Sequence, residues 1–294
     1  MEIFGIPSQA FFGQLLLGLI NGSFYAVLSL GLAIIFGLLN IINFAHGAQY
    51  MLGAFAAWLG LSYFGINYWL ALLLSPLLIG ALAVLIERTM LRHLYKLDHL
   101  YGLLLTFGLA LVAEGIFKNL FGVSGESYEA PEILQGGVHL GFMFLPIYRG
   151  WVVVAALSVC VAAWYVIERT SLGATLRAAT QRPDLVQALG INVPLLVTAT
   201  YATGAALAAF AGVLAAPILQ VNPVMGSNLI IVVFAVVVIG GMGSILGSIV
   251  TGLGLGVIEG LTKVFYPEAS ATVIFVIMTI VLLLKPAGLF GTQK

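Results

Sequence analysis

Long apolar runs separated by short polar breaks dominate the pattern of this chain. The runs cover residues 11–36, 45–63, 67–87, 100–121, 150–168, 195–216, 229–246, 249–265 and 270–285. Their length is typical of membrane-spanning helices rather than strands. The first run exceeds what a bilayer requires and contains Asn21-Gly22-Ser23, so it could be broken, tilted or divided in two. We therefore predict an all-α polytopic membrane protein with about eight to ten transmembrane helices.

The composition supports lipid as the main solvent of the chain. Apolar residues form 62% of its 294 residues and charged residues 7%, whereas soluble proteins average about 45–50% and about 25%. The 11 basic and 11 acidic residues cancel, and this balance gives no indication of nucleic-acid binding. A single cysteine, Cys160, leaves no internal disulfide and no cysteine-based metal site. We expect no metal and no cofactor.

The basic residues indicate an orientation, because they concentrate on the cytoplasmic side of membrane proteins. If nine spans alternate, three basic regions fall on one side and residues 122–149, with three glutamates and one arginine, fall on the other. The nine-span reading therefore predicts an external N-terminus, an external loop at 122–149 and a cytoplasmic C-terminus. The basic residues on the predicted cytoplasmic side are Arg88, Arg92, Lys96, Arg169, Arg177, Arg182, Lys285 and Lys294.

Residues 169–194 form the longest non-apolar stretch on the predicted cytoplasmic side. Pro183 is well placed to begin a short helix, with Asp184 in its first turn and Gly190 as its stop. Such a helix, held between two spans, could dock a cytoplasmic partner, or it could only anchor in lipid headgroups. The tetrapeptide Ile-Glu-Arg-Thr ends the runs before this stretch and before the first basic loop, at 167–170 and 86–89. We do not infer an internal repeat from it.

Glycines cluster at residues 240–256. Gly240-Gly241-Met242-Gly243 can break a helix and reverse the chain, while Gly243 and Gly247 have the spacing that lets helix backbones approach closely. The cluster could serve tight packing between spans, or it could form a moving gate. Irregular backbone is tolerated in a membrane only where protein buries it or where it lines a cavity.

Polar side chains within the apolar pattern are few. Asn40, Asn43 and His46 are spaced by three residues and are predicted to share one helical face, where they could line a solute path or bond between helices. A single histidine without a second ligand is poor support for a metal site. Glu114 with Lys118 and Glu259 with Lys263 have the i, i+4 order that favours pairing along a helix. Proton-relay roles remain open for these two pairs.

Motifs for enzymatic chemistry are missing from the sequence. It contains no G-x-x-x-x-G-K-[ST] phosphate loop, no H-E-x-x-H and no G-x-S-x-G. The loops leave no room for a soluble catalytic or ligand-binding domain. We therefore expect no enzyme, and any active transport would take its energy from another subunit. A self-sufficient secondary carrier and a passive channel for a small solute such as urea are the alternatives.

Four stretches resemble the permease subunit of bacterial branched-chain amino acid ABC importers, of the LivH type. The resemblance implies a single permease domain over residues 1–294 in the bacterial inner membrane. It also implies a second, LivM-like permease, two cytoplasmic ATPases and a periplasmic amino-acid-binding protein. The stretches are GLAIIFGLLNIINFAHG at 31–47, RTSLGATLRAATQRPDLVQALGIN at 169–192, VVVIGGMGSILGSIVTG at 236–252 and LLLKPAGLFG at 282–291.

The resemblance gives a role to the coupling segment and to a solute path, and the glycine cluster keeps the two readings that its spacing allows. Segment 169–194 would contact an ATPase, although Gln181-Arg182-Pro183-Asp184 departs from the polar or acidic run usual in the family. A zwitterionic amino acid needs a polar path through the membrane. The ATPase-coupling candidates are Gly173, Arg177, Arg182, Pro183, Asp184 and Gly190; the path candidates are Asn21, Asn40, Asn43, His46 and Asn222; the packing or gate candidates are Gly240, Gly241, Gly243 and Gly247.

Overall fold

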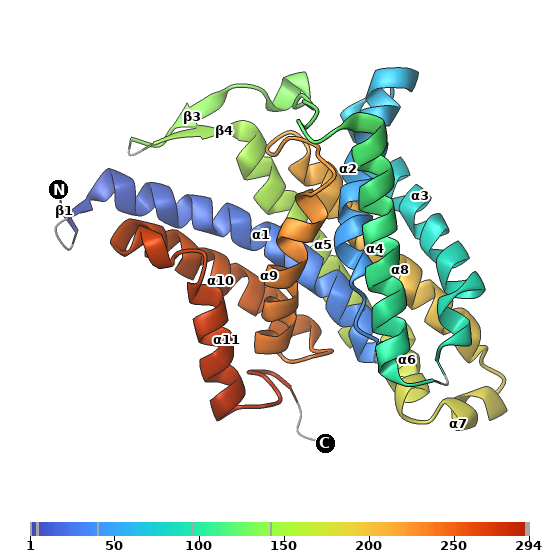
Figure 1. Cartoon of the computed structure of the whole chain (residues 1–294). Coiled ribbons are helices and arrows are strands. Elements are labelled where there is room, and N and C mark those ends of the chain that lie inside the picture. The colour runs from blue at the N-terminus through green and yellow to red at the C-terminus, as the bar shows by residue number, and fades with distance from the viewer. Residues whose placement is uncertain (1, 4–5, 40, 96, 142, 292–294) are drawn as a thin grey trace.

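The computed structural model describes residues 2–3, 6–39, 41–95, 97–141 and 143–291. Helices dominate this part of the chain, and the predicted all-α class is confirmed (Figure 1). The helices are α1 Ser8–Leu39, α2 Ala45–Phe64, α3 Tyr68–Thr89, α4 His99–Phe121, α5 Ile147–Arg169, α6 Ser171–Gln181, α7 Pro183–Ala188, α8 Val193–Ala215, α9 Met225–Gly240, α10 Ile245–Phe265 and α11 Val273–Leu284. Single turns of 3-10 helix lie at η1 Leu91–His93, η2 Glu132–Leu134 and η3 Pro267–Ala269, and two hairpins are formed by β1 Glu2–Ile3 with β2 Ile6–Pro7 and by β3 Gly137–His139 with β4 Phe144–Pro146.

One main helix forms in each predicted apolar run, and these helices differ in length. Six of the described helical segments are long and apolar enough to cross a membrane: α1, α3 with η1, α4, α5, α8 and α10. The apolar helices α9 and α11 have 16 and 12 residues, or about 24 Å and 18 Å, which is shorter than a ~30 Å hydrocarbon core. The predicted run at 229–246 also crosses the break between α9 and α10, so its boundary was wrong.

Helix α1 is continuous through Asn21-Gly22-Ser23 and runs obliquely past the other helices (Figure 1). The Ser23 hydroxyl donates to Leu19 O at 2.9 Å, which satisfies the polar group within the helix. Gly22 faces α10, where a Cβ would lie 2.9 Å from Leu253 O. The polar triplet therefore marks a close helix crossing rather than a break.

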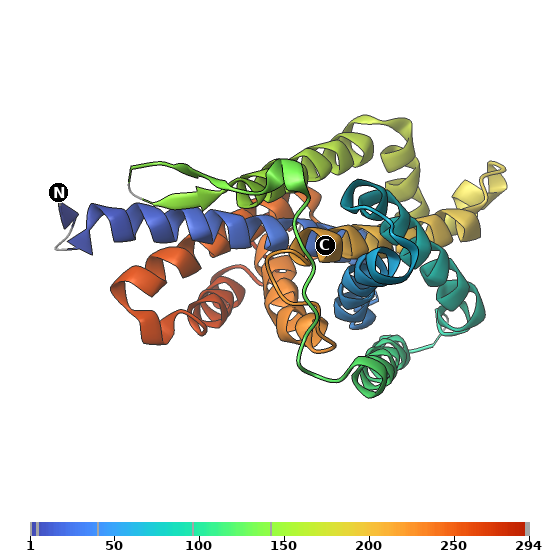
Figure 2. The same ribbon diagram turned by 90° about the horizontal axis from the view of Figure 1, so that it is seen from above.

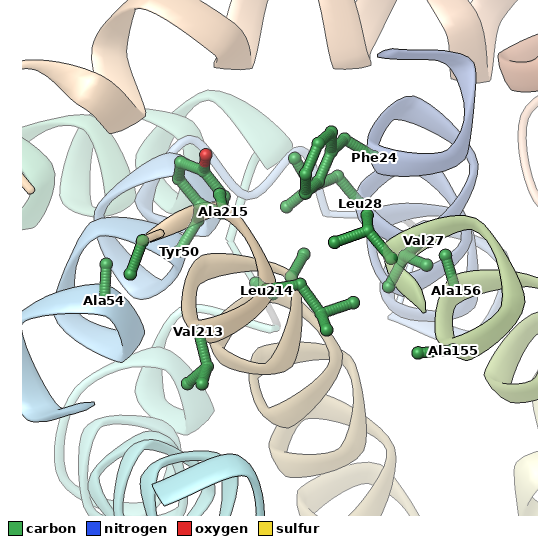
Figure 3. Packing of buried hydrophobic residues seen from close by; sticks show 14 of the residues in the cluster. Phe24, Val27, Leu28, Tyr50, Ala54, Ala155, Ala156, Val213, Leu214 and Ala215 are labelled. Atoms are coloured by element: carbon green, nitrogen blue, oxygen red, sulfur yellow. The ribbon is translucent and has the colours of Figure 1, made fainter. Parts of the chain in front are cut away.

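The core lies where α1, α2, α5 and α8 meet (Figure 3). Phe24 and Leu28 of α1 pack there with Tyr50 of α2, Ala156 of α5 and Leu214 of α8, all of them buried. Seen from above, α4 lies at the periphery, while α1 and α10 lie side by side (Figure 2). In the apolar 18-residue stretch of α1, 83% is buried within the protein, whereas in that of α4 only 11% is buried. The exposed apolar faces, such as that of α4, are therefore available to lipid or to another subunit.

The two ends of the bundle are built differently. One end carries the 122–146 connection with β3 and β4, and the other carries α6 and α7 (Figure 1). The connection is tied to the segment between α8 and α9, because Glu126 and Val221 exchange backbone hydrogen bonds of 2.8 and 2.9 Å. Tyr128, within this connection, is buried, and burial raises the pKa of its hydroxyl to about 12. Which end faces the cytoplasm stays a prediction.

Candidate translocation and coupling sites

The segment between α1 and α2 holds two of the predicted path residues. Residues 36–47 do not form one helix: α1 ends at Leu39, residues 41–43 are non-helical, and α2 begins at Ala45. The expected helical face of Asn40, Asn43 and His46 was therefore wrong, and Asn40 lies outside the described residues. Thr106 of α4 stabilises the irregular backbone, since its hydroxyl accepts from Phe44 N–H at 3.2 Å and donates to Ile42 O at 3.3 Å.

Asn43 and His46 belong to a buried polar cluster. The exposed fractions of the two residues are 1% and 0%. Asn43 Nδ2 donates to Gln49 Oε1 at 3.4 Å, and Gln49 Nε2 donates to the Tyr201 hydroxyl at 3.2 Å. His46 Nε2 lies 2.9 Å from Leu28 O. In this conformation, these side chains connect the start of α2 to α1 and α8.

The cluster leaves polar atoms unsatisfied. Asn43 Oδ1 and His46 Nδ1 are buried without a hydrogen-bond partner among the described residues, and so is the Tyr50 hydroxyl, which belongs to the same helix as His46. Buried polar groups usually have partners, because an unpaired group has lost its hydration without replacement. A conformation that admits a polar solute or water to this cluster would be favoured by these three groups.

The other path candidates lie elsewhere. Asn21 is half-buried on α1. Asn222 lies between α8 and α9, where its Oδ1 accepts from Val224 N–H at 3.1 Å and its Nδ2 donates to Gln220 O at 3.0 Å. These contacts fold the backbone of the connection locally. The structure therefore distributes the four described path residues over two helices and two connections, and brings only Asn43 and His46 into one cluster.

The predicted coupling segment forms two helices rather than one. Pro183 begins α7, Asp184 lies in its first turn, and Gly190 follows with a φ of 84°, as the sequence predicts. Sequence reasoning missed α6, which precedes α7. Arg182, Pro183 and Asp184 are exposed, so this corner of the bundle is open to a partner.

Gly173 and Arg177 form the corner between α5 and α6. A Cβ at Gly173 would overlap Ile167 O, so a larger residue cannot fit without moving the helix. Arg177 Nη1 donates to Ile167 O at 2.7 Å and lies 3.4 Å from Glu168 Oε2. The guanidinium thus caps a free carbonyl at the C-terminal end of α5, where positive charge is favourable.

The glycine cluster breaks the helix as predicted. Gly241 and Gly243 adopt φ values of 103° and 86°, and the chain reverses between α9 and α10. Gly240 and Gly247 also pack closely, because a Cβ at Gly247 would lie 2.3 Å from Gly240 O. The turn and the close packing are both present. Whether the turn moves as a gate stays a prediction.

Residues 285–291 stabilise this turn. Leu289 N–H donates to Ile239 O at 2.8 Å, and Phe290 N–H donates to Gly240 O at 3.1 Å. These contacts satisfy carbonyl groups at the end of α9 that have no partner within the helix. Gly288 approaches Gly241 so closely that a Cβ would lie 2.5 Å from its Cα. Residues 288–290 thus pack against the glycine turn and hold the end of α9 in place.

Comparison with known proteins assigns the chain to a family. The model for the family described as the branched-chain amino acid transport system / permease component matches residues 14–283. The chain belongs to this permease family. It is 31% identical to the permease protein BraD of a high-affinity branched-chain amino acid transport system of Pseudomonas aeruginosa, over 96% of each chain.

Further relatives support the same family. The chain is 28% identical to the corresponding permease LivH of Escherichia coli, over 97% of this chain and 96% of that one. It is also 28% identical to a probable LivH of Methanocaldococcus jannaschii, over 94% and 91%. No solved structure matches the chain. The family match and the six apolar helical segments of the described residues together identify this permease as a multi-pass inner-membrane protein.

Sequence reasoning missed a buried carboxylate in this permease. Glu87, near the end of α3, is 1% exposed and accepts hydrogen bonds from the Tyr95 hydroxyl at 3.0 Å and the Thr198 hydroxyl at 2.7 Å. Burial, followed by the Glu87 charge, raises the pKa of Tyr95 above its ordinary value and keeps it a donor. A glutamate at the end of an apolar run was a visible signal, but its partners lie on distant segments.

Both predicted i, i+4 pairs form. Lys118 Nζ lies 2.6 Å from Glu114 Oε1, and Lys263 Nζ lies 2.6 Å from Glu259 Oε1. Tyr25 of α1 also donates to Glu259 Oε2 at 2.7 Å. Pairing lowers the cost of charge within apolar helices. Among the described residues, no group of three His, Cys, Asp or Glu side chains could hold a metal ion.

Proposed function

We propose that this permease is the membrane-spanning subunit of an ATP-driven importer for branched-chain amino acids. The relatives carry that solute class in their names and match nearly the whole chain. The structural support is the exposed α6–α7 segment, which packs closely against the end of α5 through Gly173 and Arg177. A partner that moves α7 would therefore move the end of a long helix.

The proposed assembly contains the subunits that this chain lacks. A second, LivM-like permease would lie beside it, two ATPases would contact residues 169–194 in the cytoplasm, and a periplasmic amino-acid-binding protein would dock on the 122–149 side. The sequence contains no phosphate loop of its own, and this agrees with ATP hydrolysis by separate subunits. Gly173, Arg177, Arg182, Pro183, Asp184 and Gly190 are the residues proposed to transmit or receive the motion.

The buried polar cluster is the part of the path that the geometry supports best. The unpaired atoms of Asn43 and His46 in this cluster, and the unpaired hydroxyl of Tyr50 on the same helix as His46, can replace the water of a zwitterionic solute. All three residues are buried in this conformation, so passage requires the bundle to open. Asn21, Asn40 and Asn222 remain path candidates on separate segments, and the turn at Gly240, Gly241, Gly243 and Gly247 remains the candidate gate.

Reconstitution tests the proposed function. Proteoliposomes that contain both permeases and both ATPases, supplied with the binding protein, should accumulate radiolabelled leucine only when ATP is present. A Lys→Ala change in the phosphate loop of the ATPases should abolish accumulation. Gradient-driven uptake without the ATPases would instead support a secondary carrier. Rapid urea flux through liposomes that hold only this chain would support a passive channel.

Cysteine labelling tests the orientation, which the ATPase contact requires. Leu189, which follows α7, and Ile133, within η2, are similarly exposed, at 80% and 78%. Native Cys160 is buried and should react slowly. A membrane-impermeant maleimide added to intact cells should label Ile133→Cys and not Leu189→Cys, and opening the cells should expose the latter. The reverse pattern would contradict the proposed arrangement.

A further inference from the structure

A hollow joins the coupling segment to the glycine turn. It lies between the end of α1, the α5–α6 corner and the α9–α10 turn, and its empty space is about 880 Å³, including the part open to solvent. Ile34 and Phe36 of α1, Met242 of the turn and Ile245 at the start of α10 contribute apolar surface. None of the candidate path residues that the structure describes lines this hollow.

Its charged rim comes from the α5–α6 corner. Glu168 and Arg177 line the hollow with side chains that are 43% and 48% exposed. Among the described residues, both polar contacts of Arg177 use Nη1, so Nη2 and Nε are left to donate to a carboxylate as a fork. Glu168 Oε1 is likewise left to accept from an ammonium group.

An apolar floor beside one carboxylate and one guanidinium matches a small zwitterion with an aliphatic tail. The carboxylate of the ligand would meet Arg177, its ammonium would meet Glu168, and its tail would cover apolar atoms of α1 and the turn. A fatty acid lacks the ammonium, and glycine lacks the tail. The rim and floor together therefore favour an aliphatic α-amino acid over either.

We propose that this hollow binds an aliphatic α-amino acid on the side of the bundle that carries α6 and α7. The proposal rests on the proposed function, because there the ligand is the released cargo of the importer. A bound amino acid would contact α6 and the α9–α10 turn at once. It would therefore oppose relative movement of these elements and slow transport when cargo accumulates inside.

Photolabelling tests the site directly. The complete importer in nanodiscs would be irradiated with a diazirine analogue of leucine, and labelled peptides would be mapped by mass spectrometry. We expect label within residues 33–37, 167–181 and 242–245, and competition by leucine. Glycine, leucinol and 4-methylpentanoate should compete at least about tenfold less well, since each lacks one recognised group. Equal competition by 4-methylpentanoate, or label confined to other segments, would overturn the proposal.

A matched pair of variants separates recognition from folding. Glu168→Gln keeps the shape of the side chain and should weaken leucine competition about tenfold, the loss expected for one hydrogen bond to a charged group. Glu168→Asp should recover part of it. Glu129→Gln, on the exposed 122–149 connection, should leave competition unchanged. Equal competition in Glu168→Gln and the wild type would contradict the site.

Transport by the same preparations distinguishes this proposal from the proposed function. Leucine loaded inside the proteoliposomes should slow ATP-dependent uptake, and this inhibition should weaken in Glu168→Gln. Normal uptake with no labelling of the hollow would overturn the site alone. Labelling of the hollow without ATP-dependent uptake would overturn the proposed function and leave an amino-acid site in place.

Discussion

The tetrapeptide Ile-Glu-Arg-Thr occurs at the ends of α3 and α5, and the bundle uses its two glutamates in opposite ways. Glu87 is buried and fastens α3 to α8 and to the Tyr95 loop through hydroxyl groups. Glu168 is half exposed and lies beside Arg177 on the rim of a hollow. The difference shows that neighbouring helices, rather than local sequence, decide whether a carboxylate is buried in the bundle or left accessible at its surface.

Removing the buried glutamate should have the largest effect. Glu87→Ala leaves the Tyr95 hydroxyl without its acceptor, leaves the Thr198 hydroxyl with Pro194 O alone, and opens a cavity. We expect the free energy of unfolding to fall by about 3 kcal/mol, measured by detergent-induced unfolding of the purified permease. Glu168→Ala is the matched control and should change it by less than about 1 kcal/mol. Equal losses would remove the contrast between the two copies.

One partner of the buried glutamate offers a smaller, cleaner change. Thr198→Val deletes the hydroxyl that donates to Glu87 Oε2 and nearly conserves volume. The free energy of unfolding should fall by about 1–2 kcal/mol. Thr203 on the same helix is exposed, and its one hydrogen bond to the part of the chain that the structure describes runs along its own helix, to Ala199 O at 2.7 Å. Thr203→Val should therefore lower the free energy of unfolding by less than about 0.5 kcal/mol. A larger loss in Thr203→Val would indicate that the helix propensity of valine, and not the lost bond to Glu87, accounts for the effect of both substitutions.

The sequence predicted the helices well because apolar runs and glycine breaks are local features. The glycine turn at 241–243 and the start of α7 at Pro183 were both predicted, because each depends on the backbone preference of a single residue type. Glycine readily adopts a positive φ, and proline has a fixed φ that suits the first turn of a helix. Burial was not predictable in this way. The apolar 18-residue stretches of α1 and α4 have the same mean hydropathy of 1.9, yet α1 lies in the centre of the bundle and α4 at its periphery.

Contacts between distant segments account for most of what was missed. Thr106 stabilises the α1–α2 connection from 62 residues away, and Thr198 binds Glu87 across 111 residues. Gly18, Gly22, Gly256 and Gly260 form a close α1–α10 crossing, although only the spacing of small residues, and not the identity of the partner helix, could be read from the sequence. For the candidate site, the sequence named Asn43 and His46 but not Gln49 or Tyr201.

Arg177 allows a test of transmission at the α5–α6 corner. Arg177→Met keeps the long side chain but loses the hydrogen bond to Ile167 O. Because the group is half exposed, we expect less than about 1 kcal/mol of lost stability, together with a severalfold fall in ATP-dependent leucine uptake. Arg92→Met, an exposed change after α3, should leave uptake near the wild-type rate. If the fall in uptake by Arg177→Met were fully explained by a smaller amount of folded protein, Arg177 would have no role in transmitting motion from α6 to α5.

The smallest effect on stability is expected at the exposed glutamate. Glu168→Gln removes a charge whose contact with Arg177 is 3.4 Å long and solvent-accessible, and such pairs contribute about 0–1 kcal/mol. The free energy of unfolding should therefore change by less than about 0.5 kcal/mol. Glu87→Gln makes the same chemical change where two hydroxyls donate to the carboxylate, and should cost at least about 1 kcal/mol. Measured side by side, the two variants change identical atoms at equivalent helix ends, so a difference between them isolates the environment. If neither variant changed the free energy of unfolding, the hydroxyls around residue 87 would have to rotate and accept hydrogen bonds from the new amide group. The contact between α3 and α8 would then depend on side-chain shape and not on the charge of Glu87.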